Sequence, residues 1–320
     1  MEREAWLDLV GSGKVLVIGE LNVDLVASGL HSLPGFGQEV LANDFRVTLG
    51  SASAIFACGL ARLGHPVTFL SRVGTDDFGR FCIEALKAAG IATDQILHST
   101  SATGVTVVLS SHEDRALVTC LGAIAELRYE QLPSTVFVGH CHLHLTSYFL
   151  QHGLRPDFTA IMRDARRRGL TVSFAPNSDP AQTWEPEIWK VFAEADVVFL
   201  NEAEALGVTR ETDLRGALDM LGRRTSCAVI KQGKRGATAI RRTNVVHVDG
   251  FDVNAVDATG AGDSFAAGFI HGMLRGNELE ECMVLGNGVG ALSTLQVGGT
   301  SGQPDPTTLE NFLRTQRKEG

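Results

Sequence analysis

Glycine and aspartate are concentrated in one short stretch, VDATGAGDSFAAGF, which runs from Val256 to Phe269. Apolar residues at helical spacing follow, so a helix is predicted to begin near Gly262. A glycine-rich turn at a helix start leaves backbone N–H groups free, and the positive end of the helix dipole makes it a site for anions such as phosphate. Asp263 would lie beside that anion and could accept a proton from an attacking hydroxyl. The simpler alternative is that Asp263 only caps the helix.

Further polar residues follow the predicted strands. Because ligands collect beyond the carboxyl ends of the strands in an open parallel sheet, these residues are candidates for the same site. They are Asn22, Asp24, Asn177, Asn201 to Glu204 and Gly233 to Gly236.

The elements that must position these residues can be predicted from periodicity. Strands are expected over residues 15–20, 67–73, 142–148, 170–175, 196–201 and 227–232. Helices are expected over residues 52–63, 77–89, 156–168, 202–206, 213–223, 263–275 and 279–295. Apolar strands that alternate with helices indicate an α/β fold with a parallel sheet covered on both faces.

Two segments interrupt this alternation, residues 23–48 and 104–121. The first carries turn signals and no helix, and the second reads as two β-rich runs joined by a polar turn. Both are predicted to be antiparallel strands that form a small lid over the α/β body. Because the chain has no internal repeat and no low-complexity linker, residues 1–320 are expected to form a single domain.

Two nucleotide-binding motifs are excluded. GSGK at residues 11–14 lacks the first glycine of a phosphate-binding loop, since Asp8 occupies that position, and it precedes the first strand. The first strand is followed by GELNVD and not by G-x-G-x-x-G, which argues against a dinucleotide-binding oxidoreductase.

Several motifs together resemble those of the ribokinase-like (PfkB) carbohydrate kinases. DATGAGDSF is similar to the family's D-T-x-G-A-G-D-x-F signature. GELNVDLV, LGSASAIFACGLARLG, RVGTDDFG, LNEAEA and KQGKRG resemble its other elements in the family's order, across residues 15–300. The resemblance implies a three-layer α/β/α sandwich with a mostly parallel central sheet and a small β-sheet lid.

The resemblance also implies roles for individual residues. Asp263 corresponds to the general base, and Gly260, Ala261 and Gly262 correspond to the anion hole for the transferred γ-phosphoryl group of ATP. On the acceptor side, the corresponding residues and their neighbours are Asn22, Asp24, Gly50, Ser51, Ile55 and Ile124. On the nucleotide side they are Asn201, Lys231, Gly233, Gly236 and Asn287.

The same resemblance implies cations as cofactors. Asn201 and Glu204 correspond to the element that organises Mg²⁺ through water and phosphate, although they could also be a helix cap with a surface glutamate. Asp257 and Thr259 lie where many members of the family bind a monovalent cation such as K⁺. Many members dimerise through the lid, so a homodimer is considered as well.

Three positions depart from the family pattern. Ile55 and Ile124 stand where asparagines are expected, and Ala175 replaces the aspartate of a D-P-N element. The first two changes concern the acceptor side of the cleft, which loses two amides. A site without them cannot offset the desolvation of a polyol with the same hydrogen bonds. We therefore expect an acceptor that differs from ribose and is less polar at one end.

Three histidines, His140, His142 and His144, share one face of a predicted strand. Same-face neighbours on a strand are about 6.6–7 Å apart, which disfavours convergence on one metal ion. A structural or substrate-flanking role is the preferred interpretation.

Composition limits the partners and the compartment. The net charge of −9 argues against a nucleic-acid surface, and no apolar run is long enough for a membrane span. The N-terminal residues do not have the pattern of a signal peptide, and the six cysteines form no C-x-x-C pair. These features indicate a cytoplasmic protein.

The predicted function is an ATP-dependent kinase that acts on a primary hydroxyl of a sugar or sugar-like molecule. A nucleoside kinase of the same fold and a non-catalytic sugar or nucleotide sensor are the alternatives.

Overall fold

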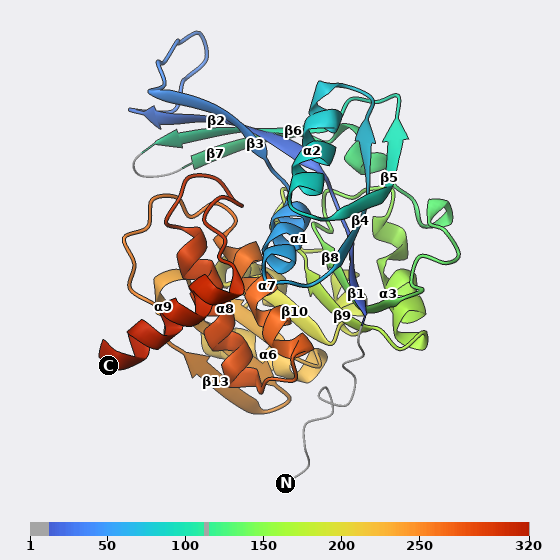
Figure 1. Cartoon of the computed structure of the whole chain (residues 1–320), viewed down its shortest axis with the longest axis vertical. Coiled ribbons are helices and arrows are strands. Elements are labelled where there is room, and N and C mark those ends of the chain that lie inside the picture. The colour runs from blue at the N-terminus through green and yellow to red at the C-terminus, as the bar shows by residue number, and fades with distance from the viewer. Residues whose placement is uncertain (1–12, 112–114, 320) are drawn as a thin grey trace.

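The computed structural model describes residues 13–111 and 115–319, and these form a central nine-stranded sheet with a smaller sheet beside it (Figure 1). In order across the central sheet, the strands are β13 (Asn244–Val248), β12 (Ala237–Arg241), β11 (Ala228–Lys231), β10 (Val197–Asn201), β9 (Thr171–Ala175), β8 (His140–Thr146), β1 (Lys14–Ile18), β4 (Val67–Gly74) and β5 (Ala92–Ser99).

The central sheet is parallel from β11 to β5 and antiparallel only at the β11–β12–β13 end. The six predicted strands are all present. The prediction missed β5 and the β12–β13 hairpin. β5 and β13 lie at the two edges of the sheet and carry many polar residues, so they lack the apolar runs that mark the buried strands. β12 is buried but short, and its two alanines and one threonine make no strong apolar run.

Helices cover both faces of the sheet, as expected for a three-layer sandwich. One face is covered by α1 (Ala52–Arg62), α2 (Asp77–Ala88), α7 (Ala261–Leu274) and α8 (Leu279–Ser293), and α9 (Pro306–Glu319) packs outside α8. The other face is covered by α3 (Phe158–Arg167), α4 (Ile188–Phe192), α5 (Glu202–Thr209) and α6 (Leu214–Arg224). Among the residues described, no helix is both long and apolar enough to span a membrane.

The two apolar cores explain why the layers hold together. Phe56, Phe199 and Phe269 are fully buried between the sheet and α1 and α7, while Phe158 and Phe174 are fully buried on the opposite face. Burying a side chain of this size contributes about 1.5–3 kcal/mol. The entries of α1 and α7, where the predicted site lies, therefore rest on a rigid core.

The smaller sheet, which we call the lid, projects from the body at the upper left of Figure 1. Its strands, in order, are β3 (Asp44–Leu49), β2 (Asn22–Leu30), β6 (Gly104–Ser111) and β7 (Arg115–Cys120). Each of the two chain segments forms an antiparallel pair, as predicted, but β2 and β6 join them in parallel. The lid is therefore one mixed sheet and not two separate hairpins.

The residues of the lid alternate between a polar and an apolar face. Thr48, Asp24, Thr106 and Thr119 are aligned across the four strands, and the adjacent row consists of Val47, Leu25, Val107 and Val118. Because neighbouring residues of a strand point to opposite faces, all four members of the first row are on one face. Arg115 belongs to this polar face and contacts Thr259, in the turn before α7. The polar face therefore looks toward the start of α7.

Candidate active site

The first turn of α7 has the conformation required for an anion site. Gly260, the N-cap residue, has a positive φ of 69°, and no side chain caps the helix. The N–H of Ala261 donates to the carbonyl of Ala258 at 3.2 Å. The N–H groups of Gly262 and Asp263 have no acceptor among the residues described. Of the predicted anion hole, Ala261 is thus engaged in the turn, and the amides of Gly262 and Asp263 are the ones left to bind a ligand.

Asp263 does not cap the helix, although its position would allow it. Burial raises the pKa of its carboxyl from 3.8 to about 7. The positive charges of Lys231 and Arg115 oppose this rise in pKa, whereas the negative charges of Glu20 and Glu204 add to it. A carboxyl with a pKa near neutral is suited to general-base work, because it can both take up and release a proton under physiological conditions.

Asn22 and Asp24 lie together at the start of β2. The amide nitrogen Nδ2 of Asn22 donates to Oδ1 of Asp24 at 2.9 Å and to the hydroxyl of Thr106 at 3.3 Å. Burial raises the pKa of Asp24 to about 6, partly offset by the hydrogen bond from Asn22. Gly50 borders this pair so closely that a Cβ atom there would lie 2.1 Å from Oδ1 of Asp24. Three of the residues predicted for the acceptor side, Asn22, Asp24 and Gly50, are therefore in contact, and Thr106 joins them.

The entry of α1 is fixed by a residue that the sequence did not single out, Glu20. Its buried carboxylate accepts hydrogen bonds from the hydroxyls of Ser53, at 2.5 Å, and Thr146, at 2.8 Å. Its carbonyl accepts a hydrogen bond from the hydroxyl of Ser51, which is the N-cap of α1 and has a φ of 75°. These hydrogen bonds fix the position of Ser51 and of the preceding Gly50. Glu20 comes two residues after the end of β1, so its position near the carboxyl end of the first strand was the available signal.

The two isoleucines that replace amides lie in different surroundings. Ile55 is buried at the start of α1, and a Cβ atom at Gly260 would lie 2.9 Å from its side chain. Ile124 is buried against Gly104, where β6 begins. Ile55 therefore packs against the turn that precedes the base, and Ile124 packs beneath the lid.

Asn201 and Glu204 form a capping box at the start of α5. The backbone N–H of Glu204 donates to Oδ1 of Asn201, and the backbone N–H of Asn201 donates to Oε2 of Glu204, both at 2.8 Å. The helix-cap interpretation is thus correct for both residues. Glu204 is buried and not on the surface, however, and its charge acts on Asp263.

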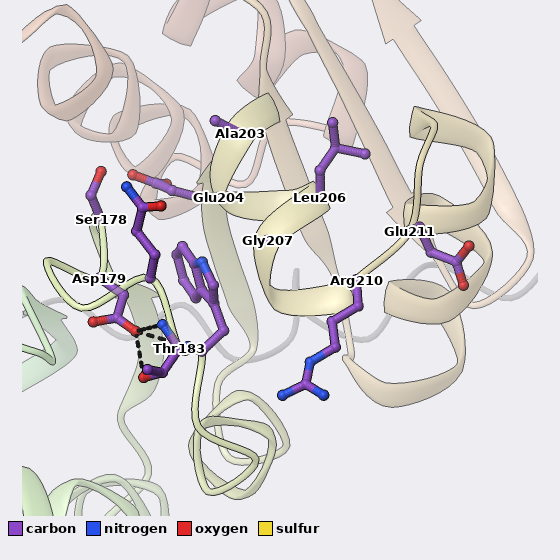
Figure 2. A pocket seen from close by; sticks show the side chains of 11 residues that line it. Ser178, Asp179, Thr183, Ala203, Glu204, Leu206, Gly207, Arg210 and Glu211 are labelled. Atoms are coloured by element: carbon purple, nitrogen blue, oxygen red, sulfur yellow. Dashed lines mark hydrogen bonds between the residues drawn. The ribbon is translucent and has the colours of Figure 1, made fainter.

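Glu204 also lines a cleft of about 680 Å³ between α5 and the loop after β9. Figure 2 shows its carboxylate on the side of Ser178 and Asp179, with Arg210 and Glu211 at the far end. Asp179 accepts three backbone hydrogen bonds and one from the hydroxyl of Thr183, which orders the loop. The loop that begins at Asn177 thus forms one wall of the cleft.

The predicted nucleotide-side residues have structural partners of their own. Gly233 and Gly236 both have positive φ, and a Cβ atom at Gly236 would lie 2.0 Å from the carbonyl of Val248. The amide of Asn287 donates to the carbonyls of Val248 and Asp249 at 3.1 and 3.0 Å. These contacts join the turn after β11, the segment after β13 and α8 into one surface.

Asp257 and Thr259 are tied to their surroundings. The carboxylate of Asp257 accepts the N–H groups of Thr259 and Gly298 at 2.8 and 2.9 Å, and its pKa is lowered because these hydrogen bonds outweigh partial burial. The hydroxyl of Thr259 accepts a hydrogen bond from Arg115 at 3.3 Å. Arg115, which the sequence did not single out, thus links the lid to the turn before α7.

The histidine run is structural. His142 and His144 are buried, and both lie within hydrogen-bond distance of the hydroxyl of Ser173, at 2.8 and 2.7 Å. The ring of His144 also stacks on Phe56. Burial lowers the pKa of both histidines, so they are neutral. Among the described residues, no cluster of three or more His, Cys, Asp or Glu side chains could hold a metal ion.

Comparison with known proteins agrees with this geometry. A family model described as pfkB family carbohydrate kinase matches residues 12–306. The chain belongs to this family. It is therefore a carbohydrate kinase, as the motif resemblance predicted, and the matched residues include the α7 turn with Asp263.

Individual relatives of this pfkB family member cover nearly its whole length. A 2-dehydro-3-deoxygluconokinase of Bacillus subtilis is 32% identical over 310 residues, 90% of this chain and 91% of the relative. A fructokinase of Klebsiella pneumoniae is 29% identical and covers 94% of this chain and 100% of its own. An E. coli structure described as ribokinase II with ATP and Mg²⁺ is similar with a TM-score of 0.83 and 25% identity, over 95% of this chain and 99% of its own.

Proposed function

We propose that this pfkB family member transfers the γ-phosphoryl group of ATP to a primary hydroxyl of a sugar or sugar-like acceptor. The observation that carries the proposal is the position of Asp263. Its carboxyl has a pKa near 7, and the backbone N–H groups of Gly262 and Asp263 have no acceptor among the described residues. A kinase needs both a proton acceptor for the hydroxyl and donors for the charge on the phosphoryl group, and this turn supplies both.

Asp263 acts as the general base in this proposal. It takes the proton of the acceptor hydroxyl as the oxygen forms its bond to the γ-phosphorus, while the N–H groups of Gly262 and Asp263, in the predicted anion-hole turn, donate to the transferred group. Asn22 and Asp24 hold the other hydroxyls of the acceptor from the polar face of the lid. Closure of the lid excludes water and so limits wasteful hydrolysis of ATP.

The nucleotide is proposed to lie against the surface that joins Gly233, Gly236 and Asn287. Asn201 and Lys231 would face its phosphates. The close packing of Gly236 against Val248 supports this assignment, because a side chain there would displace the segment. On the nucleotide side, as on the acceptor side at Gly50, the backbone packs so closely that a side chain would not fit.

A magnesium ion fits beside Glu204 as a partner of the phosphates. The carboxylate of Glu204 is buried, and its Oε1 has no hydrogen bond among the described residues. Because a lone carboxylate cannot complete an octahedral shell, water and phosphate oxygens would supply the other ligands. When bound, the ion neutralises negative charge on the phosphates.

A monovalent cation is proposed to bind beside Asp257 and Thr259. The carboxylate of Asp257 is ionised, which favours a cation, but each of its oxygens already accepts a backbone N–H. A bound K⁺ would share those oxygens and hold the turn before α7 in position.

The acceptor is proposed to differ from ribose. Ile55 and Ile124 offer no hydrogen bonds, so an acceptor that is apolar at one end gains more from this cleft than a polyol does. A nucleoside is the second candidate, since its base could lie on such apolar side chains. Ordinary efficiency with D-ribose would contradict the proposal.

A homodimer through the lid is proposed as well. Phe45, Val47 and Val118 expose 61%, 42% and 63% of their surface on the apolar face of the lid. A second copy of the same face would cover these side chains. Val118→Glu together with Val47→Glu should convert a dimer to a monomer in sedimentation analysis. A monomeric wild-type protein would contradict the dimer.

The test of the proposed function is a panel of sugars, sugar acids and nucleosides, assayed by acceptor-dependent formation of ADP. We expect one class to be phosphorylated with saturation kinetics. If the protein binds ATP and sugars but no acceptor stimulates ADP formation, the protein is a sensor and the proposal fails.

A further inference from the structure

Lys231 lies against the turn that carries the proposed base. It is the last residue of β11, and its side chain is on the same face of the sheet as that of Val229, which packs in the core beneath α7. Its Nζ atom lies 3.5 Å from the carbonyl oxygen of Gly262. A Cβ atom at Gly262 would lie only 2.9 Å from this Nζ. The glycine thus makes room for the ammonium group directly beside Asp263.

The ammonium group of Lys231 makes few hydrogen bonds within the protein. It has three donors, and the long bond to Gly262 is the only hydrogen bond that the described residues give it. The group is half-buried, so water replaces the missing bonds only in part. The N–H groups of Gly262 and Asp263 also have no acceptor among the described residues. A side-chain cation and a helix start therefore offer donors to the same anion.

The charges around Asp263 come from four different elements. Glu20 after β1 and Glu204 in α5 disfavour its ionised form, while Lys231 in β11 and Arg115 in β7 favour it. Burial is the largest influence and raises the pKa of Asp263, and Lys231 is the strongest opposing one. His144, which lies on the same side of the sheet as Lys231, is kept neutral by burial, so it adds no second positive charge.

We propose that Lys231 is a catalytic residue with two tasks: it binds an oxygen of the transferred phosphoryl group, and it keeps Asp263 ionised until the acceptor arrives. This inference rests on the proposed kinase function and deepens it. In the reaction, the acceptor hydroxyl loses its proton to Asp263, its oxygen bonds to the γ-phosphorus, and the bond from that phosphorus to the bridging oxygen breaks. ADP leaves with the electron pair of that bond. Lys231 donates hydrogen bonds and takes no part in the proton transfer.

The test compares Lys231→Met with Lys231→Arg and with Lys87→Met. Lys87 is exposed in the last turn of α2, so its variant removes the same charge and length far from the site. The pH dependence of kcat/KM is measured for each variant with the acceptor found in the substrate panel. Because a structural defect would not move a pKa, the acidic limb of the profile separates the two explanations.

We expect Lys231→Met to lower kcat by about 10- to 100-fold. We also expect its acidic limb to move to higher pH by about one unit, because the opposite charge that favoured the carboxylate is gone. Lys231→Arg should keep the limb in place, and Lys87→Met should match the wild type. A Lys231→Met enzyme whose acidic limb coincides with that of the wild type would overturn the proposal, whatever its rate.

A second measurement does not depend on turnover. The ¹³C resonance of the Asp263 carboxyl, titrated in wild-type and Lys231→Met protein, gives the pKa of the base directly. The proposal requires a higher pKa in the variant, and an unchanged pKa would refute it even if no acceptor is phosphorylated. A wild-type protein that phosphorylates nothing would instead count against the proposed kinase function.

Discussion

The carboxylate of Asp24 and the α-carbon of Gly50 are in such close contact that a Cβ atom at residue 50 would lie 2.1 Å from Oδ1. The same atom would lie 2.5 Å from Nδ2 of Asn22. Contacts this short cannot be accommodated without displacing the pair, because Asn22 and Asp24 are also hydrogen bonded to each other. The glycine is thus part of the acceptor site although it has no side chain.

Gly50→Ala is therefore expected to impair acceptor binding selectively. The displaced Asp24 can no longer meet the acceptor hydroxyls, so KM for the acceptor should rise by about tenfold or more, equivalent to about 1.4 kcal/mol. The affinity for ATP, measured by calorimetry, should not change. Gly35→Ala is the matched control, since only the flexible end of Gln38 lies near its Cβ position. Equal KM values for the two variants would contradict the assignment.

Asp263 should make the protein less stable as the pH rises. Its pKa is about 7 in the folded protein and 3.8 as an ordinary aspartate, so the folded state holds the proton more tightly. The contribution of Asp263 to stability is therefore present below about pH 4 and is lost as the pH rises toward about 7.

Asp263→Asn cannot ionise and should escape this loss. We expect its free energy of unfolding at about pH 8 to exceed that of the wild type by roughly 1–3 kcal/mol, with no gain near pH 4. Urea denaturation at both pH values measures it. The control is Asp94→Asn, at an exposed position. Its free energy of unfolding should differ from that of the wild type by the same small amount at both pH values. A gain that does not depend on pH would contradict the raised pKa.

Glu204 should affect the magnesium requirement more than the fold. Glu204→Gln keeps a side-chain oxygen for the capping box with Asn201 but loses the negative charge. We expect the Mg²⁺ concentration for half-maximal activity to rise several-fold, with a loss of stability below about 1 kcal/mol. Glu202→Gln, in the same helical turn but paired with Arg235, serves as the control. If both variants need the same Mg²⁺ concentration, Glu204 has no role at the metal.

The sequence predicted the parts of the fold that are buried. The apolar runs of β1, β8, β9, β10 and β11 and the helical faces that cover them carry a strong periodic signal. The edge strands β5 and β13 were missed because they carry many polar or exposed residues, and β12 was missed because it is short and consists largely of small residues. The parallel pairing of β2 with β6 could not be predicted either, since it joins segments far apart in the chain.

The candidate site was predictable where residue type alone limits the chemistry. The turn from Gly260 to Asp263 combines glycines with a carboxylate at a helix start, and this combination is typical of an anion site. Glu20 and Arg115 were missed because one glutamate after a strand and one arginine in a lid have no periodic or motif signal. Their importance comes from tertiary contacts with Ser53 and with Thr259, which only the fold creates.

The central claim is that Asp263 removes the proton from the acceptor hydroxyl. The most direct measurement is the turnover number of Asp263→Asn with the acceptor found in the substrate panel, alongside its affinity for ATP. The account predicts a fall in kcat of about three orders of magnitude, with ATP affinity within about twofold of the wild type. An Asp263→Asn protein that binds ATP and turns over at the wild-type rate would contradict it.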